Sequence, residues 1–347
     1  MSRIAISRDT ARARDSARPA ARAAAPPAAP ARGRGTTRQR FVAGLVATAS
    51  LLACRLPERP LLELANLAGE LWYRADSRRA AQARRNLGRV AGWLAEQGLA
   101  DARTRAAAGD PKALERLVRA AFRQYARYYL DVARAPALNR TYLAERLNIE
   151  TPEAFTAAFG QPGPRVFIGL HYGAIELQAY VAAVHAERPL TVPMETIDDP
   201  ALQGWFERTR GGLGINIVGL RQARRELMSA LARGEPVGIV GDRDLTGGGI
   251  PTKLFGAPAS IPVGPALVAI ESGAPTYVVS VRRVPGGRYV GRLDPLEVPA
   301  QGSRRERATA LIAAQARLFE LTIARAPEQW FGAFFPIWPD LEAESVR

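Results

Sequence analysis

From residue 165 onward the chain alternates between short apolar runs and helical patterns, and this alternation limits the folds it can adopt. The apolar runs are Val166–Leu170, Leu190–Pro193, Ile215–Val218, Val237–Val240, Thr276–Val281 and Tyr289–Leu293. Helical patterns lie between most of them, over Ile175–His185, Pro200–Arg210, Arg221–Arg233 and Pro262–Glu271. Strands that alternate with helices form largely parallel sheets. The sequence therefore predicts an α/β fold with a mostly parallel central sheet flanked by helices.

Two further patterns complete this half of the chain. Pro285-Gly286-Gly287 separates the last two apolar runs and predicts a hairpin. A long amphipathic helix is expected from about Arg304 to Ala324, and Pro327 ends it.

Residues 60 to 135 are helical in pattern. One apolar stripe comprises Leu61, Leu62, Leu64, Leu67 and Leu71, and another comprises Val118, Ala121, Phe122, Tyr125, Tyr129 and Leu130. Asp110-Pro111 lies between the stripes and predicts a helix start.

The N-terminus differs in composition from the rest. Residues 1 to 40 hold ten arginines and two aspartates with few large apolar residues, which predicts a disordered tail. Phe41–Cys54 is an apolar run of 14 residues, whereas about 20 are needed to span a bilayer. We expect it to be a helix that docks on the membrane. A buried core helix and a signal peptide, with Leu51–Cys54 as a lipoprotein cleavage box, are the alternatives.

These patterns divide the chain into three parts. Residues 1–40 form the tail and residues 41–56 the apolar membrane-associated helix. Residues 57–340 form the main domain, with a helical part over 57–150 and an α/β part over 151–340.

The charge of the chain favours a membrane over a nucleic acid. The 347 residues carry a net charge of +15, nearly all of it from arginine. No zinc pattern, aromatic-rich strand motif or basic zipper accompanies that charge, so we expect no nucleic-acid partner. A basic tail beside an apolar helix fits an anionic membrane surface; the alternative is compositional bias without function. The single cysteine, Cys54, rules out an intrachain disulfide and argues against a cysteine metal cluster.

The first chemically informative segment surrounds His171. The histidine follows a predicted strand, and Glu176 lies five positions on, at the start of a helical pattern. The two side chains meet only if His171 occupies the turn before the helix, and Gly169 and Gly173 permit such a turn. Glu176 would then fix the imidazole tautomer and leave the other nitrogen as a general base. A histidine satisfied by ordinary packing is the alternative.

The second segment is Asp242-Arg243-Asp244, followed by three glycines at 247 to 249. Acidic residues at a strand end suggest a site, a loop held by an Asx turn, or the Asp-X-Asp metal site of a glycosyltransferase. Arg208 and Arg210 close a helical pattern, where they either reach a phosphate or cap the helix. The chain has no G-x-S-x-G elbow, no Walker A sequence and no G-x-G-x-x-G after a strand.

The ordered set of motifs resembles the late acyltransferases of lipid A biosynthesis and the related phosphatidylinositol mannoside acyltransferases, in the lysophospholipid acyltransferase-like superfamily. The matching segments are Ala83–Leu87, Phe122–Tyr129, His171–Glu176, Gly241–Thr246, Leu254–Gly256, Pro262–Ala266 and Ala326–Trp330. Together they extend over roughly residues 42 to 340. Ala174 departs from the asparagine that the family often has there. The sequence Asp-Arg-Asp-Leu-Thr at residues 242–246 is more similar to that of the mannoside enzymes than to that of the lipid A enzymes.

The resemblance implies an enzyme that moves a fatty acyl group from acyl-CoA or acyl carrier protein to a hydroxyl of a membrane glycolipid. It implies His171 as general base, Glu176 as its orienting carboxylate and Asp242 as a further acidic residue of the site. The candidate substrate-binding residues are Arg208, Arg210, Gly173 and Arg243. No metal and no cofactor is needed.

The expected location is the cytoplasmic face of the inner (plasma) membrane, with peripheral or monotopic attachment. We expect Asp242 to lie in the same cavity as His171, because both follow strands of one parallel sheet. Backbone amides near Gly173 or the glycines 247 to 249 are candidate oxyanion donors. The alternative functions are a metal-dependent glycosyltransferase using Asp242 and Asp244, and a non-catalytic membrane-surface protein of the same fold.

Overall fold

The computed structural model describes residues 35–245 and 247–342. Its helices are α2 (Thr37–Arg55), α3 (Glu58–Ala75), α4 (Ser77–Glu96), α5 (Ala102–Gly109), α6 (Pro111–Arg134), α7 (Arg140–Arg146), α8 (Pro152–Phe159), α9 (Ile175–Ala186), α10 (Pro200–Gly211), α11 (Ala223–Ala232), α12 (Gly264–Ser272) and α13 (Arg304–Ile323). Four short 3₁₀ helices are η1 (Ala135–Ala137), η2 (Pro327–Gln329), η3 (Phe331–Phe334) and η4 (Pro339–Leu341).

The strands form one large sheet and one small hairpin. They are β1 (Leu147–Ile149), β2 (Arg165–Gly169), β3 (Leu190–Met194), β4 (Ile215–Gly219), β5 (Pro236–Val240), β6 (Ile250–Leu254), β7 (Ala257–Ile261), β8 (Thr276–Val284) and β9 (Arg288–Pro295). The main sheet has the order β1-β9-β8-β2-β5-β3-β4, and β6 pairs with β7 alone. Only β8 and β9 are antiparallel neighbours in the main sheet, joined at the predicted hairpin. The expected α/β fold with a mostly parallel sheet is confirmed.

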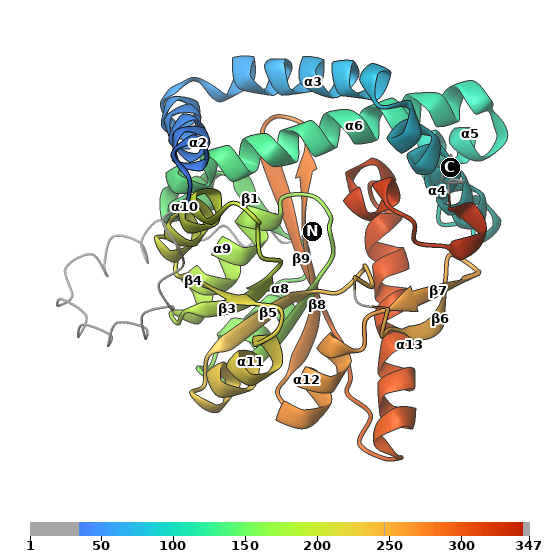
Figure 1. The fold of residues 1–347 in the computed structure, drawn as a ribbon. Helices are drawn as coiled ribbons and strands as arrows, with labels where there is room; N and C mark the ends of the chain where they lie inside the picture. Colours follow the sequence, from blue (N-terminus) through green and yellow to red (C-terminus); the bar gives the residue numbers. More distant parts are fainter. Residues whose placement is uncertain (1–34, 246, 343–347) are drawn as a thin grey trace.

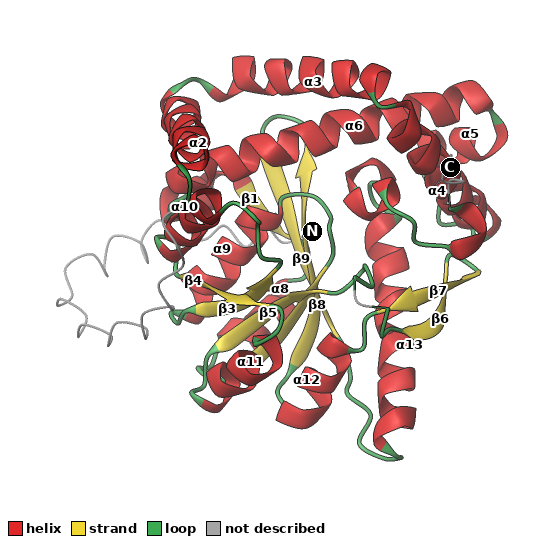
Figure 2. Ribbon diagram, in the orientation of Figure 1, coloured by secondary structure: helices red, strands yellow, loops and turns green. Residues whose placement is uncertain are grey.

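Helices cover both faces of this sheet (Figures 1 and 2). Successive side chains of strand β2 point to opposite faces of the sheet and are buried on both. Val166 and Ile168 pack in the core that includes α11, α12 and α13, whereas Phe167 packs in the core formed with α9. Strands buried on both faces read as continuous apolar runs. This explains why the runs predicted the sheet so directly.

The helical N-terminal part lies over one end of the sheet, with α3 and α6 running side by side (Figure 1). Helix α6 begins where Asp110-Pro111 predicted, and the Asp110 carboxylate accepts hydrogen bonds from the amides of Lys112 and Ala113. Such a cap satisfies amide groups that have no partner within the helix.

Helix α2 corrects one predicted boundary. It begins at Thr37 rather than at residue 41, because Thr36 and Gln39 form a capping box at its start. The expected disorder of residues 1–34 lies outside the described residues. None of the helices among the described residues is long and apolar enough to cross a membrane.

Candidate active site

The register of two parallel strands brings His171 and Asp242 together. In the pairing of β2 with β5, Gly169 lies opposite Val240. His171 and Asp242 each follow two residues later, so both emerge at the same edge of the sheet. A hydrogen bond from the Gly241 amide to the Gly169 carbonyl, 3.0 Å long, joins the two chain segments at that edge. This is the edge where open α/β sheets collect their ligand sites.

The His171 imidazole is paired with the Asp242 carboxylate. Nδ1 of His171 lies 2.7 Å from Oδ1 of Asp242, and the His171 backbone amide donates to the same oxygen at 3.1 Å. An ionised carboxylate only accepts hydrogen bonds, so this contact places the proton on Nδ1 and leaves Nε2 as the basic nitrogen. The expected proximity of Asp242 and His171 is therefore confirmed.

Trp330 completes the environment of Asp242. Its indole Nε1 donates to Oδ2 of Asp242 at 2.9 Å, and the carboxylate is only 1% exposed. Burial alone would raise the pKa of Asp242, but the charge of His171 and hydrogen bonds from His171 and Trp330 hold that pKa below its ordinary value. Asp242 therefore remains an anion inside the protein.

Glu176 has a different partner from the one that its position in the sequence suggested. Its two oxygens accept hydrogen bonds from Nη2 and Nε of Arg210, at 2.5 and 3.1 Å. The expectation that Glu176 orients His171 is thus corrected: Asp242 occupies the Nδ1 side of the ring. Glu176 lies in the first turn of α9, and its carboxylate meets Arg210 of α10.

The structure also separates the two arginines of α10. Arg210 is mostly buried, and the attraction of Glu176 raises its pKa although burial alone would lower it. Arg208, by contrast, is exposed to solvent. Of the two candidates, only Arg210 is therefore brought to Glu176.

Gly173 contributes a backbone turn to the site, whereas Arg243 contributes a charged side chain. Gly173 adopts a φ of 62°, and an added Cβ would lie 2.1 Å from the Val281 carbonyl oxygen, so only glycine fits the turn. Its amide donates to the Gln329 carbonyl at 3.0 Å, which corrects the expectation that this amide contacts substrate. The Arg243 guanidinium lies over the Phe335 ring, 3.5 Å from its centroid.

The glycine loop after Asp242 is likewise engaged with the protein. The Asp244 carboxylate accepts hydrogen bonds from the amides of Gly247 and Gly249 and from the Ser260 hydroxyl. The amides of Gly173, Gly247 and Gly249 are therefore not oxyanion donors in this arrangement. Asp242 and Asp244 also bind different groups, so the pair does not present the two converging carboxylates of an Asp-X-Asp metal site.

Three of the segments that carry the family resemblance contact η3 or the residue after it, and η3 in turn holds the backbone of His171 in place. The Phe331 amide donates to the His171 carbonyl at 2.6 Å. On its other side, the fully buried Asn86 side chain donates to the carbonyls of Ala333 and Phe335. The Tyr125 ring of α6 stacks on Phe331 with centroids 4.9 Å apart. The resemblance alone gave these segments no structural role, because their contacts join parts of the chain far apart in sequence.

The side chain of Gln329 forms hydrogen bonds that connect the segment before η3 to strand β8. Its side-chain oxygen accepts from the Arg283 amide and its side-chain nitrogen donates to the Arg283 carbonyl, both at 2.8 Å. Sequence reasoning missed Gln329 and Trp330 as parts of the site. The signal that could have pointed to them is chemical: a buried indole N–H or side-chain amide requires a hydrogen-bond partner, so both residues were candidates for a polar contact near the site.

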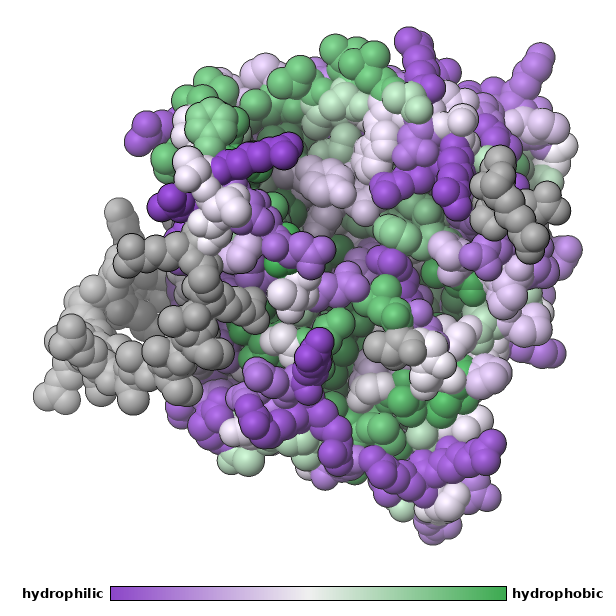
Figure 3. All heavy atoms as spheres, in the orientation of Figure 1, coloured by the Kyte–Doolittle hydropathy of each residue, from purple (hydrophilic) through white to green (hydrophobic). Residues whose placement is uncertain are grey.

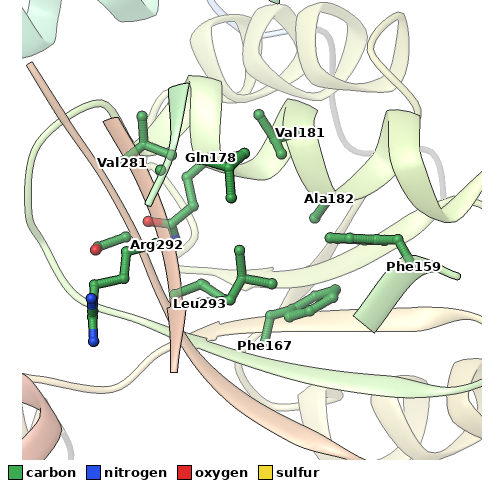
Figure 4. A pocket seen from close by; sticks show the side chains of 12 residues that line it. Phe159, Phe167, Gln178, Val181, Ala182, Val281, Arg292 and Leu293 are labelled. Atoms are coloured by element: carbon green, nitrogen blue, oxygen red, sulfur yellow. The ribbon is translucent and has the colours of Figure 1, made fainter. Parts of the chain in front are cut away.

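A small apolar pocket, with a cavity volume of about 20 Å³, lies between α9 and the sheet (Figure 4). Phe159, Phe167 and Val181 are among its walls, together with Val281. The Val281 carbonyl accepts the Ala174 amide at 2.7 Å, so this wall adjoins the turn that carries His171. His171 and Asp242 themselves do not line the pocket.

A partly exposed histidine is thus held by a buried carboxylate at one edge of a parallel sheet. Comparison with known proteins identifies the family to which the chain belongs. A sequence model described as bacterial lipid A biosynthesis acyltransferase matches residues 36–332. The chain belongs to this acyltransferase family, and it is an enzyme.

Individual relatives agree with the family. A phosphatidylinositol mannoside acyltransferase of Mycolicibacterium smegmatis is 29% identical over 275 residues, which cover 71% of this chain and 88% of the relative. A protein of the same name from Mycobacterium tuberculosis is 30% identical over 199 residues, covering 56% of this chain and 58% of the relative. The predicted resemblance is confirmed, and the chain is an acyltransferase of the lipid A or phosphatidylinositol mannoside type.

Proposed function

We propose that the enzyme transfers a fatty acyl group from a thioester donor, acyl-CoA or acyl carrier protein, to a hydroxyl of a membrane glycolipid. The single observation that carries this proposal is the His171–Asp242 pair, with Nδ1 and Oδ1 2.7 Å apart. It leaves Nε2 of a partly exposed histidine as the proton acceptor. The acceptor is a phosphatidylinositol mannoside or a lipid A precursor, the former favoured by the names of the two relatives.

The proposed reaction is direct transfer. Nε2 of His171 takes the proton of the acceptor hydroxyl while the hydroxyl oxygen bonds to the thioester carbonyl carbon. The tetrahedral intermediate then breaks its C–S bond, and the imidazolium returns the proton to the departing thiolate. Asp242 stabilises the imidazolium between the two steps, as a buried anion next to a developing cation. The products are the acylated glycolipid and a free thiol.

Glu176 and Arg210 serve in this proposal as positioning residues. Their ion pair ties the first turn of α9 to the end of α10, and Arg210 also lies over the Phe206 ring. Arg243, adjacent to Asp242 and partly exposed, is proposed to contact an anionic part of the donor or the acceptor. Arg208, which is exposed and is not paired with Glu176, is a second candidate for that role.

We also propose that the enzyme works at the cytoplasmic face of the plasma membrane as a peripheral or monotopic protein. Helix α2 supports this, since Phe41, Leu45 and Leu52 all point away from the protein. Cys54 lies within the same helix, with its thiol directed at the Ala133 carbonyl of α6.

The test of function is a product analysis. The purified full-length enzyme is incubated with long-chain acyl-CoA or acyl carrier protein and with each candidate glycolipid, and products are identified by mass spectrometry. We expect one acceptor to gain one acyl chain, with no dependence on EDTA. Transfer of a sugar from a nucleotide-sugar in a metal-dependent reaction, with no acylated product from any pair, would refute the proposal.

A further inference from the structure

Helix α3 has its apolar residues on the unexpected side. It buries the small residues Ala65 and Gly69 and exposes Leu64, Leu67 and Leu71, with Leu64 62% exposed. An ordinary surface helix does the reverse and turns its leucines toward the core. The predicted apolar stripe of this helix therefore faces outward in part.

The burial of small residues follows from how closely α3 approaches α6. A Cβ added at Gly69 would lie 2.6 Å from the Cα atom of Arg123. The Glu70 carboxylate accepts a 2.6 Å hydrogen bond from Arg119 and also pairs with Arg123, which fixes the rotation of α3 about its axis. The outward direction of the three leucines is thus built into the helix packing.

Helix α2 repeats the arrangement. It buries Ala43, Ser50 and Ala53, and the Ser50 hydroxyl donates to the Ala133 carbonyl of α6 at 2.6 Å. Its large apolar residues are exposed, with Phe41 66% exposed. In Figure 3 hydrophobic surface covers α2 at the upper left and continues along the upper edge over α3. Contiguous apolar patches on protein surfaces mark interaction sites.

The exposed charges of this segment are mostly positive, which favours a negatively charged partner. The exposed basic residues of this segment are Arg38, Arg40, Arg55, Arg59, Arg74 and Arg78. Glu63 is the one exposed acidic residue between residues 35 and 78, a range that the structure describes completely. An apolar face accompanied by arginines complements a bilayer that carries anionic headgroups.

We propose that the outer faces of α2 and α3 form one docking face that lies flat on an anionic phospholipid bilayer. The docking face comprises Phe41, Val42, Leu45, Leu51, Leu52, Leu56, Leu64, Leu67 and Leu71. Its leucines enter the interface between headgroups and acyl chains, and its arginines meet the lipid phosphates. This inference rests on the proposed membrane association and adds α3 to it as a second contact that the N-terminal apolar run does not include.

Vesicle binding tests the role of α3. The full chain carrying Leu64→Gln, Leu67→Gln and Leu71→Gln is compared with wild type by co-sedimentation with phosphatidylcholine vesicles, with and without phosphatidylglycerol. Glutamine and leucine have similar helix propensities, so α3 should remain helical. We expect the triple variant to lose binding at least about tenfold, because it no longer transfers three exposed leucine side chains from water into the bilayer interface. Leu220→Gln, at another exposed leucine, should bind as wild type does.

A second variant separates charge from apolar contact. Arg59→Gln with Arg74→Gln and Arg78→Gln should reduce the preference for phosphatidylglycerol and the sensitivity to salt while leaving binding to neutral vesicles unchanged. Equal effects on both vesicle types would overturn the assignment of the arginines to lipid phosphates.

Two results would overturn the inference about α3. One is vesicle binding by the triple leucine variant equal to that of wild type. The other is a dimeric wild type that the triple variant converts to a monomer without loss of vesicle binding, which would make this face a contact between two copies of the chain. Acyl transfer to a short-chain, water-soluble acceptor should be unchanged in the variant. Its absence in wild type too would instead refute the proposed function.

Discussion

At the scale of single residues, the site depends on a buried anion with three hydrogen bonds. Asp242 accepts from the ring and the amide of His171 and from the indole of Trp330. Each donor holds the carboxylate in one orientation, and the carboxylate in turn holds the imidazole. In the proposed reaction, a histidine aligned in this way would transfer a proton without first having to reorient.

Trp330 should therefore affect turnover more than a comparable tryptophan does. Trp330→Phe removes the donor to Oδ2 of Asp242, so we expect kcat to fall about tenfold with KM little changed. Trp338 is the matched control, because it is equally buried but donates to the Leu254 carbonyl. Trp338→Phe should cost similar stability and leave kcat near wild type. Equal kcat losses in steady-state kinetics of the two variants would contradict this.

The Glu176–Arg210 pair is expected to govern stability as well as activity. Glu176 is 3% and Arg210 15% exposed, so Glu176→Gln leaves a mostly buried cation without its carboxylate. We expect a loss of about 3 kcal/mol in the free energy of unfolding. Denaturant titration of Glu176→Gln, Arg210→Gln and the double variant tests this. If the two single costs simply add in the double variant, the residues do not act as a pair.

At the scale of elements, the end of α9 should respond to pH. The His185 ring packs against Phe155 and Phe159, with centroids 4.8 and 5.7 Å away. Burial, with a smaller effect of Arg140, lowers the pKa of His185 from 6.5 to about 4. The unfolded chain therefore binds this proton first as pH falls. The stabilisation is complete above about pH 6.5 and is lost as pH decreases toward 4.

His185→Leu removes that titration. Between pH 7 and pH 5 wild type should lose about 2 kcal/mol of stability that the variant keeps. The measurement is the free energy of unfolding against pH for both proteins. Identical slopes would show that His185 does not carry the effect.

The contact of α3 with α6 makes a second prediction at this scale. Gly69→Ala should destabilise the protein by about 1–3 kcal/mol, since its Cβ meets the backbone of Arg123. Gly92, inside α4, has no atom within 4 Å of an added Cβ. Gly92→Ala should therefore stabilise by about 0.5–1 kcal/mol through helix propensity. Thermal melts that show the same sign for both variants would contradict this packing.

At the scale of the whole molecule, the sequence predicted the elements better than their contacts. Runs such as Val237–Val240 identified strands because both their faces are buried. The edge strand β1 was missed because it has three residues, and β6–β7 was missed because Pro251, Lys253 and Pro258 break any alternation. Periodicity identified the leucines of α3 as one stripe but does not say which side faces solvent.

The proximity of His171 and Asp242 was predicted, whereas the partner of Glu176 and the contacts of Gln329 and Trp330 were not. His171 and Asp242 were expected together from their strand ends, and Glu176 was expected at His171 because it is near in sequence. The ring direction of His171 depends on the register between β2 and β5 and on contacts with η3. Both are long-range, so no local pattern in the sequence encodes them.

One kinetic comparison tests the central claim that His171, held by Asp242, is the base for acyl transfer. Single-turnover rates are measured for wild type, His171→Ala and Asp242→Asn with a thioester donor, after circular dichroism shows that each variant is folded. We predict that both variants lose about 10²-fold or more in rate while donor affinity stays near wild type. Full activity in folded His171→Ala would contradict the account.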